Sequence, residues 1–232
     1  MTSSTTCVIL AGGLGTRLRS AVPDLPKCLA PVHQRPFLEL QIDSLAERGV
    51  DRFVLSLGYM AEAVVEAISA FRIAHDIEYV IEKEQLGTGG AALFALNETG
   101  EDEVLIANGD TWTDAPLTPM LNHLQLADGE LMRLAATHVP DRGRYGGLEL
   151  SAGKVTGFSP KGLPGAGLIN SGLYRIHRNA FNNFVPGQAF SLEADLMPQL
   201  VEKGALTAAS LDGMFIDIGI PDDYRRFCDL NA

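Results

Sequence analysis

A glycine-rich stretch near the amino terminus holds the residues best suited to chemistry. It reads LAGGLGTRLR over residues 10–19, and Lys27 follows shortly after it. Glycines let backbone N–H groups approach phosphate oxygens, and Arg17 and Lys27 supply the positive charge that an anionic ligand needs. The stretch therefore predicts a triphosphate site. Taken alone, its GGxG turn is equally typical of a solvated surface loop.

Two widespread phosphate-binding motifs do not fit this stretch. The Walker A pattern GxxxxGK[ST] does not occur in the chain, and a dinucleotide fingerprint starting at Gly13 has Leu18 in place of its third glycine. That fingerprint also requires an acidic residue after the second strand, whereas the apolar run 53–57 continues into Gly58 and Tyr59. The phosphate site must therefore be of another kind.

The chain of 232 residues is acidic, with 18 Lys and Arg residues against 29 Asp and Glu residues and a net charge of −11. This charge disfavours general binding to nucleic acid or anionic lipid. A hydrophobic content of 46% is ordinary for a globular domain. The apolar runs are far shorter than the roughly 20 residues of a membrane-spanning helix, and the start MTSSTT lacks the cations of a signal peptide. We expect a cytoplasmic enzyme without nucleic-acid or membrane partners.

The cysteines and histidines are scattered. Cys7, Cys28 and Cys228 form no CxxC pair, and the five histidines show no HxH or HxxxH spacing. This pattern predicts neither a disulfide framework nor a zinc site. Buried structural thiols are the expectation.

The order of predicted elements indicates an α/β fold. Strands and helices alternate up to residue 107, which predicts a largely parallel sheet with helices on both faces. Asp110 follows the strand at 103–107, and ligands of such sheets bind at the carboxyl ends of strands. We therefore expect Asp110 and the glycine stretch to face one crevice. The other predicted strands are 7–11, 53–57 and 77–81, and the predicted helices are 37–48, 61–71 and 89–96.

The pattern changes after about residue 131. Short β-like runs separated by glycines predict a smaller β-rich part over 133–139, 145–150, 155–159 and 168–176. Helical patterns return at 191–203, where Pro198 should kink the helix, and at 221–227, where Pro221 suits the first turn. Linkers and repeats are absent from the sequence, so we predict a single domain over residues 1–232.

These motifs together resemble the sugar-1-phosphate nucleotidyltransferase family. The chain departs from the family signature GGxGTRLxxxTxxxPK near Val22, where the second threonine is missing, and otherwise follows it. Further stretches occur in the family's order, namely EQLGTGGA at 84–91, NGD at 108–110, YG at 145–146, Lys161, GLINSG at 167–172 and IDIG at 216–219. The resemblance implies a Rossmann-like, GT-A-like fold, with a mixed, mostly parallel sheet flanked by helices. Its nucleotide-binding half would span about 1–130, and a small β-rich sugar-phosphate-binding half about 131–232.

The resemblance also implies roles for the matching residues. Mg²⁺ would bind to Asp110 and Asp217, because transfer between two anionic substrates needs a cation and Mg²⁺ prefers carboxylate oxygens. The alternative is structural: Asp110 would cap the segment that follows it, and Asp217 would form a turn before Gly219. Catalysis is expected from Arg17, Lys27 and Asp110, and nucleotide binding from Gly12, Gly13, Gly15, Thr16, Gln85 and Gly87. The segment LGTGG at 86–90 has an alternative role to nucleotide binding, namely the start of a helix capped by Thr88.

Sugar-phosphate binding is expected from Gly146, Lys161, Asn170 and Glu193. The family's Glu-Lys-Pro appears here as Pro160-Lys161-Gly162, which removes one acceptor for a sugar hydroxyl. Glu193 is a candidate replacement, and a solvated helix charge is the alternative. For Trp112 and Tyr145, packing is favoured over stacking on a ligand.

Within the family, stretches such as LAGGLGTRLRS, GLINSGLY and FSLEADLMPQL resemble the heptose-1-phosphate guanylyltransferase branch. The implied reaction transfers a nucleotidyl group from GTP to D-glycero-D-manno-heptose 1-phosphate, giving an NDP-sugar and pyrophosphate. Alternatives are mannose 1-phosphate with GTP, another hexose 1-phosphate with UTP or TTP, and a non-catalytic nucleotide-sugar-binding regulatory domain. A glycosyltransferase is disfavoured because Asp110-Thr111-Trp112 lacks the second Asp of a DxD motif. The expected partners are thus an NTP and a sugar 1-phosphate. Association into a homo-oligomer is compatible with the sequence.

Overall fold

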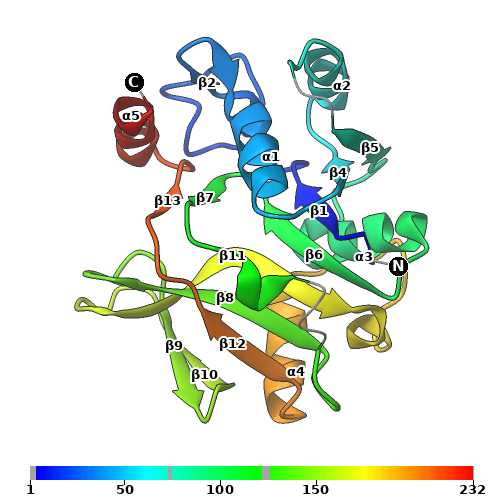
Figure 1. Ribbon diagram of the computed structural model, residues 1–232, viewed down its shortest axis with the longest axis vertical. Coiled ribbons are helices and arrows are strands. Elements are labelled where there is room, and N and C mark those ends of the chain that lie inside the picture. Colours follow the sequence, from blue (N-terminus) through cyan, green and yellow to red (C-terminus); the bar gives the residue numbers. More distant parts are fainter. Residues whose placement is uncertain (1–3, 73–74, 122–125, 232) are drawn as a thin grey trace.

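The fold is built on one large mixed sheet. The computed structural model describes residues 4–72, 75–121 and 126–231, so the first three residues of MTSSTT lie outside it. Within these ranges, nine strands form one sheet in the order β5-β4-β1-β6-β11-β8-β12-β10-β9 (Figure 1). The strands are β1 (Thr6–Leu10), β4 (Arg52–Leu57), β5 (Asp76–Ile81), β6 (Glu103–Asn108), β8 (Met132–Val139), β9 (Gly147–Ser151), β10 (Lys154–Ser159), β11 (Gly167–His177) and β12 (Leu206–Ser210).

The first half of the chain forms the parallel part of the sheet. β1 pairs in parallel with both β4 and β6, and β5 pairs in parallel with β4. Alternate side chains of β1 enter different cores: Val8 packs with Ala92 and Leu96, while Ile9 on the other face packs with Ile42. The helices involved are α1 (Phe37–Glu47), α2 (Ala61–Ser69) and α3 (Gly87–Thr99). The predicted arrangement of helices on both faces is therefore confirmed.

The second half of the chain extends the same sheet. β11 pairs antiparallel with both β6 and β8, and β12 runs parallel to β8. The hairpin β9–β10 completes this end of the sheet. The predicted α/β class, a mixed sheet flanked by helices with a β-rich second part, is confirmed, and strands from both halves share one hydrogen-bonded surface.

The helix predicted around Pro198 is interrupted near this residue. A π-helical turn covers Leu192–Leu196, and α4 then runs over Met197–Glu202. Proline has no N–H to donate to the carbonyl four residues earlier, so a regular α-helix through Pro198 would lack one hydrogen bond. The wider π-helical turn lies in the segment where this bond is missing. The last helix, α5 (Pro221–Leu230), begins at its proline as predicted.

Small ribbons outside the main sheet were not expected from the sequence. β2 (Pro31–Val32) pairs with β3 (Arg35–Pro36), and β7 (Thr111–Thr113) pairs with β13 (Phe215–Asp217). β12 was also missed. Each strand of these ribbons has two or three residues, too few to show an alternating hydrophobic pattern in the sequence.

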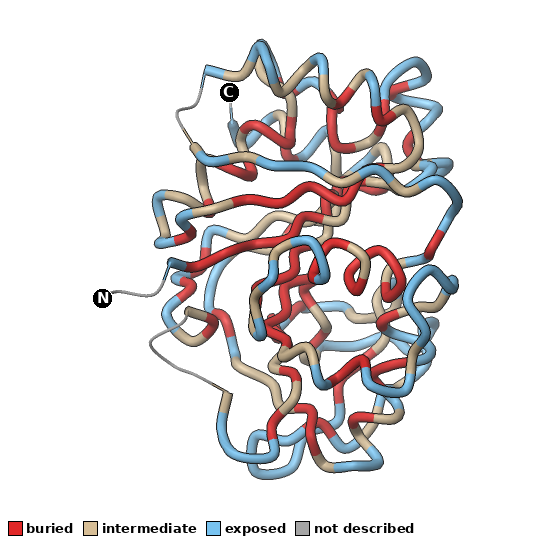
Figure 2. Tube along the Cα trace, turned by 90° about the vertical axis from the view of Figure 1, so that its right-hand side faces the viewer, coloured by how far each residue is buried: buried red, intermediate tan, exposed pale blue. Residues whose placement is uncertain are grey.

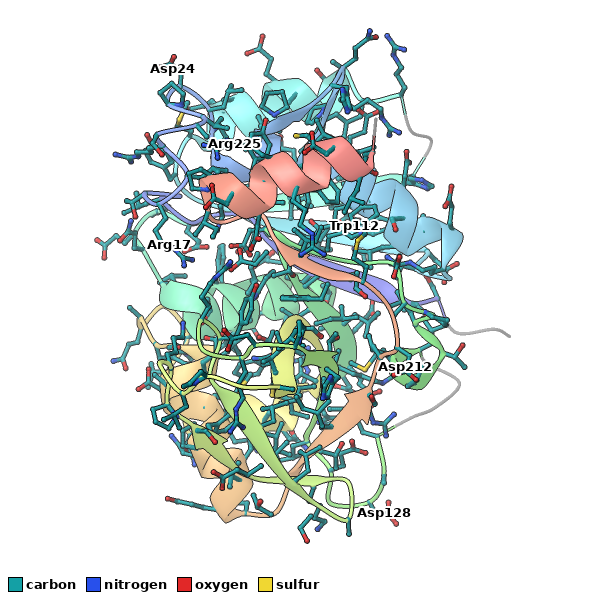
Figure 3. All side chains as sticks on the ribbon, turned by 90° about the vertical axis from the view of Figure 1, so that its left-hand side faces the viewer. Arg17, Asp24, Trp112, Asp128, Asp212 and Arg225 are labelled. Carbon is teal, nitrogen blue, oxygen red and sulfur yellow. The ribbon has the colours of Figure 1, made fainter. Side chains whose placement is uncertain are left out.

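A third core lies under α5. Trp112 packs edge-on against Phe37 and Phe227, with ring centroids 6.3 and 5.1 Å apart, and Figure 3 shows it beside the carboxy-terminal helix. Tyr145 likewise packs edge-on against Phe215. The structure therefore confirms the prediction that Trp112 and Tyr145 pack against other rings. Figure 2 shows long runs of buried residues through the middle of the molecule.

Two of the three cysteines confirm the expectation of buried thiols, and Cys228 does not. Cys7 and Cys28 are buried, Cys228 is partly exposed, and none of these described residues forms a disulfide. Burial raises the pKa of Cys7 and of Cys28 to about 12, so both thiols stay protonated. Among the described helices, none is long and apolar enough to cross a membrane.

Candidate active site

A cavity of about 390 Å³ opens where β1 and β6 end, as the strand-end argument predicted. Its walls combine the glycine stretch, the end of β5, the start of α3 and the Asn108-Gly109-Asp110 turn. Of the residues predicted from the sequence, those on its walls are Gly12, Gly13, Lys27, Gln85, Gly87 and Asp110.

The glycines of the loop are required by close backbone approaches. A Cβ on Gly12 would lie 3.1 Å from the amide nitrogen of Gly58 and 3.0 Å from Glu82 Oε1. A Cβ on Gly109 would lie 2.7 Å from the carbonyl oxygen of Leu10. A larger residue at Gly109 would overlap the Leu10 carbonyl, and one at Gly12 would push its neighbours aside, so the backbone itself forms part of the cavity wall.

Lys27 and Asp110 form an ion pair at the cavity edge, and both side chains are largely buried. Gly15, in the left-handed region at φ +59°, packs directly against the Cβ of Lys27. Gly15 thus positions Lys27 and is not itself on the cavity wall. Thr16 and Arg17 are exposed on the same loop, and Figure 3 labels Arg17.

Asp110, Asp217 and Arg17 converge at Gly219. A Cβ on Gly219 would lie 2.6 Å from Asp217 Oδ1, 3.4 Å from Asp110 Oδ2 and 3.3 Å from a guanidinium nitrogen of Arg17. The β7–β13 ribbon causes this convergence, because it pairs Asp217 with Thr111, and the amide of Ile218 donates to the carbonyl of Asp110. Two aspartates distant in the sequence thereby become neighbours.

The electrostatics of this aspartate pair fit a cation. Burial, and then the neighbouring Asp110 carboxylate, raise the pKa of Asp217. The amide of Gly219 donates to Asp217 Oδ1 at 2.7 Å, so the turn alternative describes part of its role. Within the described ranges, no cluster of three or more His, Cys, Asp or Glu residues could hold a metal. Mg²⁺ needs only one or two carboxylates when phosphates supply further oxygens, so this pair is suited to it.

Glu82 lines the same cavity and was missed by the sequence analysis. It directly follows β5, and its Oε1 accepts a hydrogen bond from the Ser56 hydroxyl at 3.2 Å while its Oε2 accepts one from the Leu86 amide at 3.1 Å. Burial raises its pKa. Gln85, the predicted base-contacting residue, also lines the cavity but is exposed. The strand-end rule that identified Asp110 would also have identified Glu82.

The residues predicted to bind the sugar phosphate form two groups. Gly146, with φ +79°, lies beside Lys161: a Cβ on the glycine would be 3.7 Å from Lys161 Cγ. Both lie where the β9–β10 hairpin ends at the Gly147–Ser159 pair. Lys161 is exposed.

The second group joins Asn170 to Glu193 through Tyr174. Asn170 Nδ2 donates to the Tyr174 hydroxyl at 2.9 Å, and that hydroxyl donates to Glu193 Oε1 at 3.3 Å. The Thr88 hydroxyl donates to Glu193 Oε2 at 3.0 Å. Glu193 is therefore exposed but bonded to two other elements, β11 and α3, which is not the behaviour of a solvated helix charge.

The alternative role of Thr88 as a helix cap is wrong. α3 begins at Gly87, its N-cap position is Leu86, and that position makes no side-chain capping bond. The hydroxyl of Thr88 instead accepts a bond from the Leu192 amide and donates to Glu193. The LGTGG loop therefore packs against the segment that carries Glu193.

Comparisons with known proteins identify the family. The family model described as "Nucleotidyl transferase" matches residues 6–230. The chain belongs to the nucleotidyl transferase family. It is 36% identical over 221 residues to the D-glycero-alpha-D-manno-heptose 1-phosphate guanylyltransferase of Campylobacter jejuni, covering 95% of this chain and 97% of the relative. Identity is 38% over 221 residues to the enzyme of the same name from Aneurinibacillus thermoaerophilus, covering 94% and 95%.

A solved structure similar in sequence has the same fold. HddC from Yersinia pseudotuberculosis superposes with a TM-score of 0.88 at 33% identity, covering 98% of this chain and 100% of that one. The same protein has been solved in complex with GMP-PN. The family resemblance inferred from the sequence is thus confirmed, and with it the prediction of a sugar-1-phosphate nucleotidyltransferase.

Proposed function

We propose that the protein transfers a guanylyl group from GTP to D-glycero-α-D-manno-heptose 1-phosphate, giving GDP-heptose and pyrophosphate. The observation that carries this proposal is the carboxylate of Glu82 inside the nucleotide cavity. The similarity to two heptose 1-phosphate guanylyltransferases and to HddC in complex with GMP-PN supports the same substrates.

Glu82 suits guanine better than the other bases. Guanine presents two adjacent donors, its N1–H and its 2-amino group, and an ionised carboxylate accepts two parallel bonds. Each oxygen of Glu82 accepts one bond from the protein and keeps acceptor capacity for the cavity. Adenine would place an acceptor, its N1, against this carboxylate. Gly12 lies beside Glu82 and lets the base approach the backbone.

The anionic part of GTP would lie between the glycine loop and the cations. Arg17 and Lys27 neutralise the triphosphate and the charge that develops during transfer. An oxygen of the sugar phosphate attacks the α-phosphorus in line, the new P–O bond forms, and the bond to the β-phosphate breaks. Pyrophosphate carries away the displaced electron pair. Catalysis of this kind consists mainly of positioning and electrostatic stabilisation.

Asp110 and Asp217 would hold Mg²⁺ through their carboxylate oxygens. The ion, when bound, supplies positive charge at the α-phosphate and the leaving pyrophosphate. Lys27 pairs with Asp110, and it would be available to the triphosphate if that carboxylate held Mg²⁺. The Arg17 guanidinium lies beside Gly219, near both aspartates, and would add positive charge at the same point.

The sugar phosphate would contact the second half of the chain. Lys161 is a suitable point charge for its phosphate, beside the backbone of Gly146. Asn170 and Glu193 would bind its hydroxyls. This assignment keeps the division at about residue 130 as a functional one within a single domain, with both halves contributing to one site.

Pyrophosphate release with Mg²⁺ tests the proposal. GTP, ATP, UTP and TTP are each combined with the 1-phosphates of heptose, mannose, glucose and N-acetylglucosamine. We expect the highest kcat/KM for GTP with the heptose 1-phosphate. A maximum for mannose 1-phosphate would replace the sugar and keep the reaction. Nucleotide binding without pyrophosphate release from any pair would contradict the reaction and favour a non-catalytic binding domain.

A further inference from the structure

Tyr174 is a buried tyrosine whose hydroxyl joins the two side chains assigned to the sugar. It lies on β11 and has 0% of its surface exposed. Its oxygen is 2.9 Å from Asn170 Nδ2 and 3.3 Å from Glu193 Oε1. A side chain with this volume could fill the core as phenylalanine. The hydroxyl therefore needs its own explanation, because a buried polar group without a role only adds a desolvation cost.

The chemistry of the partners determines the direction of both hydrogen bonds. Burial, and then the nearby Glu193 carboxylate, raise the pKa of Tyr174 well above its ordinary value, so the phenol keeps its proton. An amide nitrogen only donates and an ionised carboxylate only accepts. The Tyr174 oxygen must therefore accept from Asn170 and donate to Glu193.

This direction orients the amide of Asn170. Its Oδ1 accepts a hydrogen bond from the amide of Gly172 at 3.0 Å, and one N–H is used by Tyr174. The flipped amide would lose both bonds. The second N–H of Nδ2 remains a donor, and the side chain is only partly buried. Asn170 therefore presents a donor to a ligand.

Glu193 is held in the complementary role. Its Oε1 accepts from Tyr174, and its Oε2 accepts from the hydroxyls of Thr88 and Ser191 at 3.0 and 3.1 Å. A carboxylate has about four acceptor positions, so roughly one remains free. Because Asn170 and Glu193 both bond to the Tyr174 oxygen, the free donor and the free acceptor lie within the span of one sugar ring.

We propose that Tyr174 is a positioning residue for the sugar 1-phosphate, whose hydroxyl holds Asn170 as a donor and Glu193 as an acceptor for hydroxyls of the sugar. The inference rests on the proposed function, since it assumes that these two side chains bind the sugar. A sugar hydroxyl both donates and accepts, so one hydroxyl, or two neighbouring ones, satisfies both groups. Tyr174 itself does not touch the substrate.

The substitution Tyr174→Phe removes only the hydroxyl and tests this role. Steady-state pyrophosphate release is measured with the sugar 1-phosphate that the wild type turns over fastest, varying each substrate separately. We expect the KM for the sugar phosphate to rise about tenfold, the effect of one lost hydrogen bond to a charged group, and the KM for GTP to change less than twofold. Tyr79→Phe is the matched control, because Tyr79 is an exposed residue of β5.

A purely structural role would give different results. An unchanged sugar-phosphate KM, or equal rises in the KM values for both substrates together with a lower melting temperature, would overturn the proposal. Should Tyr174→Phe not fold, a double-mutant cycle of Asn170→Ala and Glu193→Gln replaces it: we expect non-additive effects on the sugar-phosphate KM, and additive effects refute the link. A wild type inactive with every sugar 1-phosphate contradicts the proposed function itself, whereas an active wild type with an unaffected Tyr174→Phe contradicts only the positioning role.

Discussion

Replacing Glu82 by glutamine should weaken the selection of GTP while leaving the fold intact. In the wild type the Leu86 amide donates to one Glu82 oxygen and the Ser56 hydroxyl donates to the other. A glutamine would turn its oxygen toward the Leu86 amide, because its NH₂ group cannot accept that bond. The NH₂ group would then replace one of the two acceptors that guanine needs, and the negative charge would be lost.

The size of the effect follows from these bonds. A hydrogen bond to a charged group contributes about 1.5–3 kcal/mol, and the variant loses one such bond and the charge assistance of the other. A total of about 2–4 kcal/mol corresponds to roughly a 30- to 1000-fold fall in kcat/KM for GTP. ITP lacks the 2-amino group and depends on fewer of these bonds, so its kcat/KM should fall less.

Pyrophosphate release with GTP and ITP, for the wild type and for Glu82→Gln, measures this difference. Glu84→Gln is the matched control, because Glu84 is an exposed carboxylate two residues away that does not line the cavity. We expect the GTP-to-ITP preference to collapse in Glu82→Gln and to persist in Glu84→Gln. A Glu82→Gln enzyme with the wild-type preference and an unchanged kcat/KM for GTP would refute the assignment of Glu82 to the base.

Burial raises the pKa of Glu82, so its carboxylate becomes protonated at a higher pH than that of an exposed glutamate. The KM for GTP should therefore rise as the pH falls through that pKa. A pH profile of KM no steeper than that of Glu82→Gln would contradict this prediction. Gly89→Ala would place a Cβ 2.2 Å from the Phe190 ring, and overpacking of about 1–3 kcal/mol should lower the melting temperature by roughly 2–12 °C. Gly13→Ala is its control, because a Cβ built there has no atom within 4 Å apart from its own residue and chain neighbours, and equal shifts in calorimetry would argue against the clash. Asp110→Ala should lower turnover by orders of magnitude with an unchanged circular dichroism spectrum, and near-normal turnover would remove the metal assignment.

The nucleotide-binding half could be predicted from the sequence because its signals are local. The apolar run of β1 ends in the glycine loop, and its strands and helices differ clearly in hydrophobic period. Parallel strands end at one edge of a sheet, so the sequence alone places Asp110 next to the glycine loop. Arg17 and Lys27 belong to the same segment, and their charges in an acidic chain already indicate an anionic ligand.

The rest depended on contacts between residues far apart in the chain. Asp217 meets Asp110 only through a ribbon whose strands are three residues long, too short to leave a periodic signal. Glu82 directly follows β5, so the strand-end rule applies to it as it does to Asp110, but its bond to Ser56 on β4, which orients its carboxylate at the cavity wall, forms only in the folded chain.

Tyr174 shows the same division most clearly. It lies in the strand predicted over 168–176, and its side chain is buried. Its bond to Asn170, four residues earlier on β11, is local, but only tertiary structure brings its hydroxyl against Glu193 on the π-helical turn before α4. Hydrophobic periodicity determines which face of an element is buried, because that choice is local. The pairing of polar groups depends on how the buried faces pack together, so it is decided only when the chain has folded.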